Sequence, residues 1–419
     1  MHVESEATQH LHRAAVAARR ASHDLARTPA QARDGALRAM ADALRAHAGE
    51  VLAANATDLA ASTANDAFRD RLTLTAARIE AMARGFEDVA ALPDPLARTL
   101  AEWTRPNGLR IRRIATPIGV IGMIYESRPN VGADAAALCL KSGNAVILRG
   151  GSDSLHSARA IHAALADGLR AAGLPTDAVQ VAPSADRAYV AAMLGAAGLI
   201  DLLIPRGGRS LVERVQRDAR VPVLAHAEGL NHTYVHAAAD PAMARAIVAN
   251  GKMRRTGICG ATETLLIDAA IAPSLLPLLI DDLRALGCDF RADARARRIV
   301  PGLREASESD FDTEWLDAVL SVAVVDGVDA ALAHIARHGS EHTDAIVTED
   351  ADAADRFLGG VDSAVALWNA STQFCDGGEF GFGAEIGIAT GRLHARGPVG
   401  LEQLTTYRYV VLGTGQVRR

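Results

Sequence analysis

The N-terminal region, residues 5–91, carries apolar side chains at the spacing of helix turns. Leu37, Met40, Ala41 and Leu44 recur at intervals of one, three and four, and alanine and arginine are frequent around them. Residues at this spacing share one face of an α-helix. The pattern predicts several packed helices, which end before the Pro93-Asp-Pro95 break.

The pattern changes to that of β-strands after residue 108. Residues 109–114 alternate apolar and charged side chains, which is typical of a strand with one exposed face. Residues 117–125 are almost continuously apolar, which is typical of a strand that is buried on both faces. We therefore expect an exposed arm that leads into the core of a sheet.

Beyond residue 145, short apolar runs alternate with helical patterns. This alternation is typical of βαβ crossovers and of a parallel sheet, in which ligands bind at the carboxyl ends of the strands. A second α/β block begins near residue 239, and the glycine-rich residues 369–400 are expected to form a loop that lines a site. The predicted strands are 145–148, 178–181, 199–204, 221–224, 264–267, 319–325, 345–347, 363–368 and 407–412, and the predicted helices of the first block are 154–172, 185–196 and 208–218.

Composition narrows the class of protein. The chain has 419 residues, 49% of them hydrophobic and 22% charged, which suffices for two domains with real cores. Lys and Arg number 44 against 50 Asp and Glu, so no global positive field favours nucleic acid as a partner. No export signal is visible, and the most apolar run, 265–280, is too short and too interrupted by proline to span a membrane. We expect a cytoplasmic protein that does not bind membranes.

The irregular spacing of the four cysteines predicts reduced thiols rather than disulfides or a zinc site. Cys259 lies between Gly257 and Gly260 and close to Arg254 and Arg255. Positive charge lowers a thiol pKa and favours the thiolate nucleophile, but a buried, unreactive cysteine is equally consistent with the spacing. Of the other three, Cys139 is expected in the core, Cys288 carries no motif, and Cys375 is a candidate for a second reactive thiol.

Two glycine turns follow predicted strands and are candidates for phosphate binding. They are Arg149-Gly150-Gly151 and Arg206-Gly207-Gly208. Glycine lets backbone N–H groups approach a phosphate, and arginine adds charge-assisted hydrogen bonds. No Gly-x-Gly-x-x-Gly fingerprint is present, and either turn alone is equally consistent with an ordinary βα connection. Together they favour a dinucleotide.

Asn130 and Arg128 follow the most apolar strand, where this type of sheet exposes its ligands. The amide of Asn130 suits an oxyanion and Arg128 suits a phosphate or carboxylate, although a simple turn after Pro129 explains the asparagine as well. The histidines at 334, 338 and 342 are spaced four apart, but Gly339 should end their helix and no carboxylate completes a ligand set. We therefore expect no metal site.

Segments along nearly the whole chain carry a family resemblance. The chain closely resembles the γ-glutamyl phosphate reductases, also called glutamate-5-semialdehyde dehydrogenases, of the aldehyde dehydrogenase superfamily. The resemblance implies an α/β fold with two domains built on Rossmann-like parallel sheets and a β-arm for oligomerisation. The matching segments are 117–121, 125–130, 143–151, 201–208, 252–264, 342–346, 369–372 and 394–402.

The resemblance also implies the limits of the domains and the reaction. Residues 1–107 and 117–238 would form an NADP-binding domain, residues 239–396 a catalytic domain, and residues 108–116 and 397–419 the oligomerisation arm. The implied reaction is the reduction of L-glutamate 5-phosphate by NADPH to L-glutamate 5-semialdehyde, the second step of proline biosynthesis. A homo-oligomer and contact with glutamate 5-kinase, which would supply the acyl phosphate, are implied as partners.

By resemblance, Cys259 is the nucleophile that forms a thioester, and Asn130 with the Cys259 backbone N–H stabilises the oxyanion. Glu314 would hold the nicotinamide ribose, and Arg149, where many relatives have lysine, would approach the adenosine ribose or its phosphate. The candidate ligands of the substrate's phosphate and carboxylate are Arg128, Arg254, Arg255 and Arg396.

Glu228 decides between two kinds of aldehyde dehydrogenase. It stands at the spacing of the glutamate that activates water in hydrolytic, NAD-linked members, but their Glu-Leu-Gly-Gly-Lys pattern is absent around it. A phosphate-dependent enzyme must keep water from its thioester, so we favour a structural or substrate-binding role for Glu228. The hydrolytic enzyme and a catalytically silent scaffold remain the alternatives.

Overall fold

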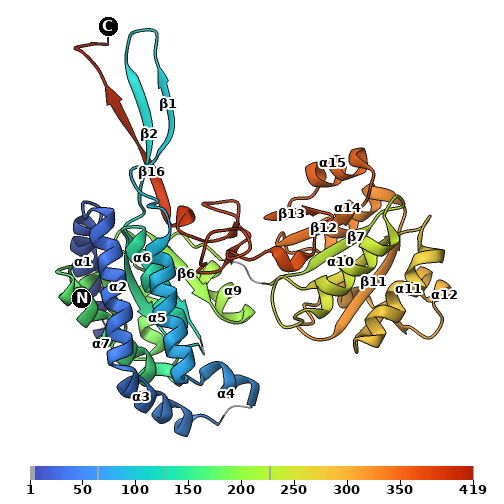
Figure 1. The fold of residues 1–419 in the computed structure, drawn as a ribbon, viewed down its shortest axis with the longest axis horizontal. Helices are drawn as coiled ribbons and strands as arrows, with labels where there is room; N and C mark the ends of the chain where they lie inside the picture. Colours follow the sequence, from blue (N-terminus) through green and yellow to red (C-terminus); the bar gives the residue numbers. More distant parts are fainter. Residues whose placement is uncertain (1–4, 64–65, 127, 226–227, 419) are drawn as a thin grey trace. The chain divides into compact units, whose positions relative to one another are not determined.

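The computed structural model describes residues 5–63, 66–126, 128–225 and 228–418. Ser127 in the segment around Asn130 and His226 in the segment around Glu228 lie outside these ranges. The chain folds into two compact units (Figure 1). Unit 1 comprises Met1–Ala225, Gly381–Gly387 and Val399–Arg419, and unit 2 comprises His226–Phe380 and Ile388–Pro398.

The N-terminal region of unit 1 is helical, as the apolar spacing predicts. Leu37, Met40, Ala41 and Leu44 are completely buried on one helix, which packs against two others of this unit. Ser5 and Thr75 cap helices by accepting hydrogen bonds from backbone N–H groups of the first turn. The helices are α1 (Glu6–Leu25), α2 (Ala30–Ala46), α3 (Ala48–Ala61), α4 (Asp66–Leu72) and α5 (Ala76–Ala91).

Unit 1 is built on a four-stranded parallel sheet with the order β5-β4-β3-β6. Every residue of β3 is buried, as expected for the most apolar run. The strands are β3 (Val120–Tyr125), β4 (Ala145–Arg149), β5 (Val179–Val181) and β6 (Leu202–Arg206). The remaining helices are α6 (Asn130–Lys141), η1 (Ser152–Ser154), α7 (Leu155–Ala171), η2 (Thr176–Ala178), α8 (Arg187–Leu194) and α9 (Arg209–Asp218).

The order of this sheet reverses at β3. The chain builds β4 and β5 on one side of β3 and then returns to place β6 on the other side. Ligands of such sheets bind at this switch point, outside the carboxyl ends of the strands. The predicted strand 221–224 is wrong: only a bridge between Leu203 and Val223 forms. Pro222 lacks the N–H that a longer ladder needs, and it contributes only its carbonyl, to Leu203 N.

A three-stranded antiparallel sheet completes unit 1 and extends away from its helices (Figure 1). Its strands are β1 (Thr99–Thr104), β2 (Arg110–Pro117) and β16 (Thr405–Leu412), with β2 in the centre. The strands expected at 109–114 and 407–412 therefore pair with each other, from Arg110 opposite Leu412 to Pro117 opposite Thr405. β1 was not predicted from the sequence, and its residues were expected in the nucleotide domain.

Unit 2 contains a seven-stranded parallel sheet, with the order β10-β9-β11-β8-β7-β12-β13. Helices cover both faces: Leu265 and Ile267 of β8 pack into one core with α10 and α11, and Leu266 packs into a second core with α14 and α15. The strands are β7 (Asn231–Val235), β8 (Thr262–Asp268), β9 (Asp289–Ala292), β10 (Arg304–Glu305), β11 (Val319–Val325), β12 (Thr343–Val347) and β13 (Val365–Trp368). The helices are α10 (Pro241–Met253), α11 (Ala272–Ala285), α12 (Ala294–Ile299), α13 (Glu308–Phe311), α14 (Gly327–His338) and α15 (Ala351–Gly360).

The glycine-rich C-terminal region has little regular structure. It holds η3 (Thr372–Phe374), the short antiparallel pair β14 (Ile388–Ala389) and β15 (Gly397–Pro398), and η4 (Glu402–Leu404). The expectation of a mostly irregular loop at 369–400 is confirmed. Among the described residues, none of the helices has both the length and the apolar surface that a membrane crossing requires.

Candidate active site

Cys259 lies in a turn between α10 and β8, and its side chain is the most accessible of the four cysteines. Cys139, Cys288 and Cys375 are buried. Burial raises the pKa of the Cys139 thiol and raises that of Cys288 to about 12, so neither forms a thiolate near neutral pH. The burial of Cys375 also disfavours it as a second reactive thiol.

Gly229, just before β7, and Asn231, the first residue of β7, fix the backbone of the turn that carries Cys259. The side-chain amide of Asn231 donates to the carbonyl oxygen of Cys259 at 2.6 Å and to that of Ala261 at 2.9 Å. The chain at Gly229 passes so close that a Cβ there would lie 2.1 Å from the Cys259 carbonyl oxygen. Only glycine fits at such an approach. Neither residue was predicted from the sequence, because their contacts join segments that are far apart along the chain.

Glu314 lies in the connection between α13 and β11, and its side chain reaches the backbone at Gly229 beside the Cys259 turn. Its Oε1 accepts a hydrogen bond of 2.9 Å from the backbone N–H of Gly229. The structure therefore gathers Cys259 and Glu314 around Gly229, at the amino ends of the neighbouring strands β7, β8 and β11. Glu228 is half-buried beside Gly229. Ligands of the unit 1 sheet are expected at the carboxyl ends of its strands, whereas this site lies at the amino ends of strands in the unit 2 sheet.

The candidate substrate arginines of unit 2 differ in how they are held. Arg254 and Arg255 are exposed at the end of α10, where the Gln373 side chain contacts both. Arg396 is held by the chain itself: Asp362 Oδ1 lies 2.8 Å from its Nη1 and Glu341 Oε2 lies 3.3 Å from its Nη2. These carboxylates already match the charge of Arg396.

In unit 1, Asn130 is the first residue of α6 and follows the carboxyl end of β3. Its side-chain amide donates to Asp134 Oδ2, one helix turn later, at 3.1 Å. Burial raises the pKa of Asp134 to about 6, against the hydrogen bond from Asn130 and the nearby positive charge of Arg206. An amide carries two N–H donors, and Asp134 orients the group by taking one of them. Arg128 is exposed just before this helix.

The two glycine turns surround different groups. Gly208 N donates to Glu126 Oε2 at 3.1 Å, and a Cβ on Gly207 would lie 2.4 Å from the same oxygen. This turn at the start of α9 therefore accommodates a negatively charged group. In the other turn, a Cβ on Gly150 would lie 3.1 Å from the Tyr125 ring, so Gly150 is needed for packing.

A cavity of about 350 Å³ opens at the carboxyl ends of β3 and β4. Arg149, Gly151, Ser152 and Arg187 line it, together with Glu126 and Asp153. Arg149 donates to the Ala185 carbonyl at 2.7 Å, and burial lowers the pKa of its guanidinium. Two arginines beside a serine hydroxyl suit a phosphorylated ribose. Ser152 closes the glycine turn that begins at Arg149, whereas Arg187 was missed because it belongs to no recognisable sequence motif.

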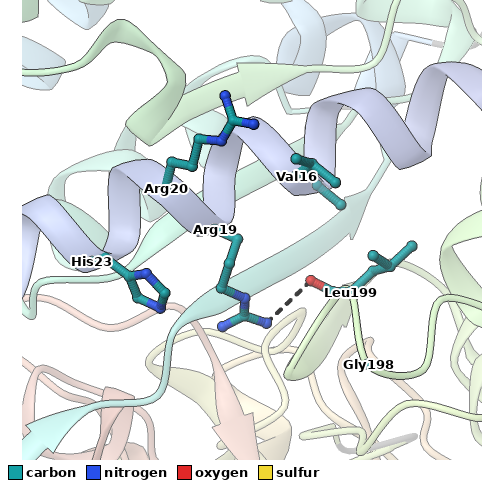
Figure 2. A pocket seen from close by; sticks show the side chains of 7 residues that line it. Val16, Arg19, Arg20, His23, Gly198 and Leu199 are labelled. Carbon is teal, nitrogen blue, oxygen red and sulfur yellow. Dashed lines mark hydrogen bonds between the residues drawn. The ribbon is translucent and has the colours of Figure 1, made fainter.

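A second cavity, of about 260 Å³, lies between α1 and the connection before β6 (Figure 2). Arg19, Arg20 and His23 contribute basic side chains to it. Figure 2 shows the Arg19 guanidinium turned toward the Leu199 carbonyl and Arg20 directed away from it. Arg19 also lies 2.6 Å from Asp201 Oδ2, so its charge is matched within the chain.

The three spaced histidines lie at or beyond the end of one helix. α14 ends at His338 with Gly339 as its C-cap, as predicted, and His342 precedes β12. His334 packs against Phe311, His232 and His338. Within the described ranges, no group of three or more His, Cys, Asp or Glu side chains is arranged to hold a metal ion.

The chain is similar to known enzymes along almost its full length. The model of the aldehyde dehydrogenase family matches residues 1–297. A γ-glutamyl phosphate reductase of Gluconobacter oxydans is 74% identical over 99% of this chain and 97% of its own. The crystal structure of γ-glutamyl phosphate reductase from Thermotoga maritima has a TM-score of 0.96 at 41% identity, over 98% of this chain and 100% of that one.

A more distant likeness concerns the fold alone. An engineered glycolyl-CoA reductase with bound NADP⁺ has a TM-score of 0.66 at 16% identity, over 96% of each chain. The resemblance and the α/β fold expected from the sequence are thus confirmed. The chain belongs to the aldehyde dehydrogenase family and, within it, to the γ-glutamyl phosphate reductases.

Proposed function

We propose that the chain reduces L-glutamate 5-phosphate to L-glutamate 5-semialdehyde with NADPH and releases phosphate, as the second step of proline biosynthesis. The observation that carries this proposal is the accessible Cys259 in a turn held by Asn231 and adjoining Glu314 through Gly229. The name of the Gluconobacter oxydans relative supports the choice of substrate. Unit 1 would bind the cofactor and unit 2 would carry the nucleophile.

Cys259 and Asn130 perform the acyl transfer in this mechanism. The Cys259 thiolate attacks the C5 carbonyl of the acyl phosphate, and the developing oxyanion is stabilised by the Asn130 amide and the Cys259 backbone N–H. Phosphate leaves and a thioester to Cys259 remains. The thioester carbonyl carbon would accept a hydride, which NADPH would supply when bound. The resulting thiohemiacetal anion then collapses: its C=O bond forms again as the C–S bond breaks, which releases the aldehyde and regenerates the Cys259 thiolate.

The residues present fit a phosphorylated nicotinamide cofactor. Arg149, Ser152 and Arg187 would hold the adenosine ribose and its 2′-phosphate in the larger cavity. Gly207 and Gly208, which accommodate the Glu126 carboxylate, would accept the pyrophosphate, with Gly151, Gly150 and Arg206 nearby. Glu314 would hold the nicotinamide ribose. That a protein of the same fold binds NADP⁺ supports this assignment.

The exposed arginines are the better candidates for the anionic ends of the substrate. Arg128, Arg254 and Arg255 are exposed, and Arg396 is held in place by Asp362 and Glu341. Arg396 stays a candidate for the same role. Glu228 would bind substrate or support the turn before β7. A base that activates water would instead hydrolyse the thioester before it could be reduced.

The arm of three strands would mediate assembly into a homo-oligomer. Trp103, Tyr407 and Tyr409 are 39%, 50% and 55% exposed on its surface, and β1 and β16 present unpaired edges. Contact with glutamate 5-kinase and a cytoplasmic location stay predictions from the sequence.

One assay separates the reductase from the hydrolytic enzyme and the silent scaffold. It measures NADP⁺ reduction by glutamate semialdehyde, with and without phosphate or arsenate, for the wild type, Cys259→Ala and the buried-thiol control Cys375→Ala. The reductase needs phosphate or arsenate and loses activity only with Cys259. Phosphate-independent oxidation to glutamate would replace our proposal with the hydrolytic enzyme, and a phosphate-dependent Cys259→Ala would remove Cys259 from the mechanism.

A further inference from the structure

Beside the candidate site of unit 2 lies an ion pair that the mechanism above does not use. Lys252 in the last turn of α10 and Glu263 near the start of β8 are 0% and 1% exposed, with Nζ and Oε2 2.5 Å apart. Desolvation makes such pairs costly, and apolar side chains of similar size are often as stable or more stable. Stability alone is therefore a weak reason for charged residues here.

The second carboxylate oxygen of Glu263 holds the turn that carries Glu314. Glu263 Oε1 accepts a hydrogen bond of 3.3 Å from the backbone N–H of Leu316, two residues beyond Glu314. Leu316 has a φ of 50°, in the left-handed region that strains the backbone of a non-glycine residue. The Glu263 oxygen thus fixes a turn that would otherwise relax.

The contacts of Lys252 and Glu263 connect both sides of the site. Lys252 lies on the helix that leads into the Cys259 turn, and a Cβ on Gly257 in that turn would lie 3.7 Å from the Leu316 carbonyl oxygen. Glu314 in turn accepts from Gly229 N, and Gly229 adjoins the Cys259 carbonyl. These contacts connect the Cys259 turn, the turn that carries Glu314, and Gly229 to one another.

We propose that Lys252 and Glu263 are positioning residues that hold the Glu314 turn at a fixed spacing from the Cys259 turn. This inference rests on the proposed function, in which Glu314 holds the nicotinamide ribose and Cys259 carries the thioester. Hydride transfer needs both groups in one geometry, and a misplacement of about 1 Å costs on the order of 10²-fold in rate. Glu263 acts through Leu316 and Glu314, and it touches neither substrate nor cofactor.

Single substitutions are poor tests of this proposal, because each leaves an unpaired charge in the core. Burial raises the pKa of Glu263 to about 7, against the opposing effect of the Lys252 ammonium. Removing one partner of a buried pair strongly destabilises the fold, which would obscure any effect on positioning. Both charges must be removed together.

Two double variants differ only in the acceptor for Leu316 N. Lys252→Met with Glu263→Gln removes the ion pair but keeps a side-chain carbonyl at the place of Oε1, whereas Lys252→Met with Glu263→Leu removes the acceptor as well. We expect the leucine variant to lose on the order of 10-fold or more in kcat and to bind NADP⁺ on the order of 10-fold more weakly. The glutamine variant should recover most of this loss. The alkylation rate of Cys259 by iodoacetamide should stay within about 3-fold of wild type in both, because the thiol itself is untouched.

Thermal unfolding shows whether each variant folds, and a third variant covers the case in which neither double variant does. Leu316→Val lies on an exposed turn and keeps the N–H, but a β-branched side chain disfavours the positive φ further, so NADP⁺ should bind on the order of 3-fold more weakly. Equal NADP⁺ affinity and kcat in the two folded double variants, or an unchanged affinity in Leu316→Val, would overturn the positioning role. Full activity of Cys259→Ala would instead overturn the proposed function.

Discussion

The backbone carbonyl of Cys259 accepts a hydrogen bond of 2.6 Å from the side-chain amide of Asn231. Asn231 is completely buried at the amino end of β7, and the same amide also holds Ala261. The turn that carries the thiol is thereby attached to a neighbouring strand of the sheet, and its position does not depend on the turn's own sequence alone.

Replacing Asn231 by alanine should displace the thiol. Two buried carbonyls lose their donor, so we expect the free energy of unfolding to fall by about 1–3 kcal/mol and kcat to fall on the order of 10-fold or more. Asn55→Ala is the matched control, because Asn55 is equally buried in unit 1 and its amide donates to Leu72 O. Urea unfolding and steady-state kinetics should show similar losses of stability but a loss of activity only for Asn231→Ala. Equal activity in both variants would contradict this.

Gly229→Ala should be more damaging to activity than to folding. The new methyl group would lie 2.1 Å from the Cys259 carbonyl oxygen, so either the turn or the start of β7 must move. We expect a loss of at least ~10²-fold in kcat/KM. Gly85→Ala, in α5 with open space around it, should gain up to about 1 kcal/mol and keep full activity. An active Gly229→Ala enzyme would show that the approach of the two chains is not needed for catalysis.

Asn130→Ala tests the oxyanion donor. Loss of one such donor typically costs ~10²–10³ in kcat, and the positive charge of nearby Arg206 still favours the Asp134 carboxylate. The variant should keep its circular dichroism spectrum and its alkylation rate at Cys259 while turnover falls. Normal turnover would remove Asn130 from the mechanism.

Arg187→Ala tests the choice of cofactor. A lost charge-assisted hydrogen bond to a 2′-phosphate is worth about 1.5–3 kcal/mol, so the Kd for NADPH should rise by at least ~10-fold while the Kd for NADH changes little. Arg170→Ala, on the exposed end of α7, is the matched control. Fluorescence titration measures both cofactors without turnover. A parallel loss of NADH and NADPH binding would place Arg187 away from the 2′-phosphate.

His334 should make the fold sensitive to acid. Burial lowers its pKa from the usual 6.5 to about 3, helped by the nearby His232, His338 and Arg337. Between these values the unfolded chain binds more protons than the folded one, so this contribution to stability is complete above pH 6.5 and declines as the pH falls toward 3. Relative to neutral pH, we expect a loss of up to about 2 kcal/mol at pH 5. Urea unfolding of His334→Asn should show a smaller loss, and His12→Asn, exposed on α1, should match the wild type.

The order and type of most elements follow from the sequence, because each depends on local spacing. Leu37 to Leu44 mark a helix face, and the apolar run at β3 marks a buried strand. The two strands that were missed or wrongly predicted are those whose formation depends on pairing with another strand rather than on local spacing. β1 exists because β2 offers it an edge, and residues 221–224 do not form a strand because Pro222 cannot donate.

Only some residues of the candidate site could be predicted from the sequence. Cys259 and Asn130 stand out through their neighbours in sequence, and Glu314 came from the family resemblance alone. Asn231, Gly229, Glu263 and Arg187 had no local signal, because each acts through a contact with a distant segment. Such contacts appear only once the strands are in register.

The pairing of β16 with β2 has a consequence for synthesis. A ribosome makes β2 before any part of unit 2, but its partner β16, Thr405–Leu412, follows unit 2 in the sequence. Asn144 of unit 1 likewise donates to the carbonyl of Leu404. Unit 2 is nearly continuous in sequence and can close on itself first, whereas the nascent unit 1 must keep one edge of β2 unpaired until unit 2 has been made. The completion of unit 1 therefore waits for the synthesis of unit 2.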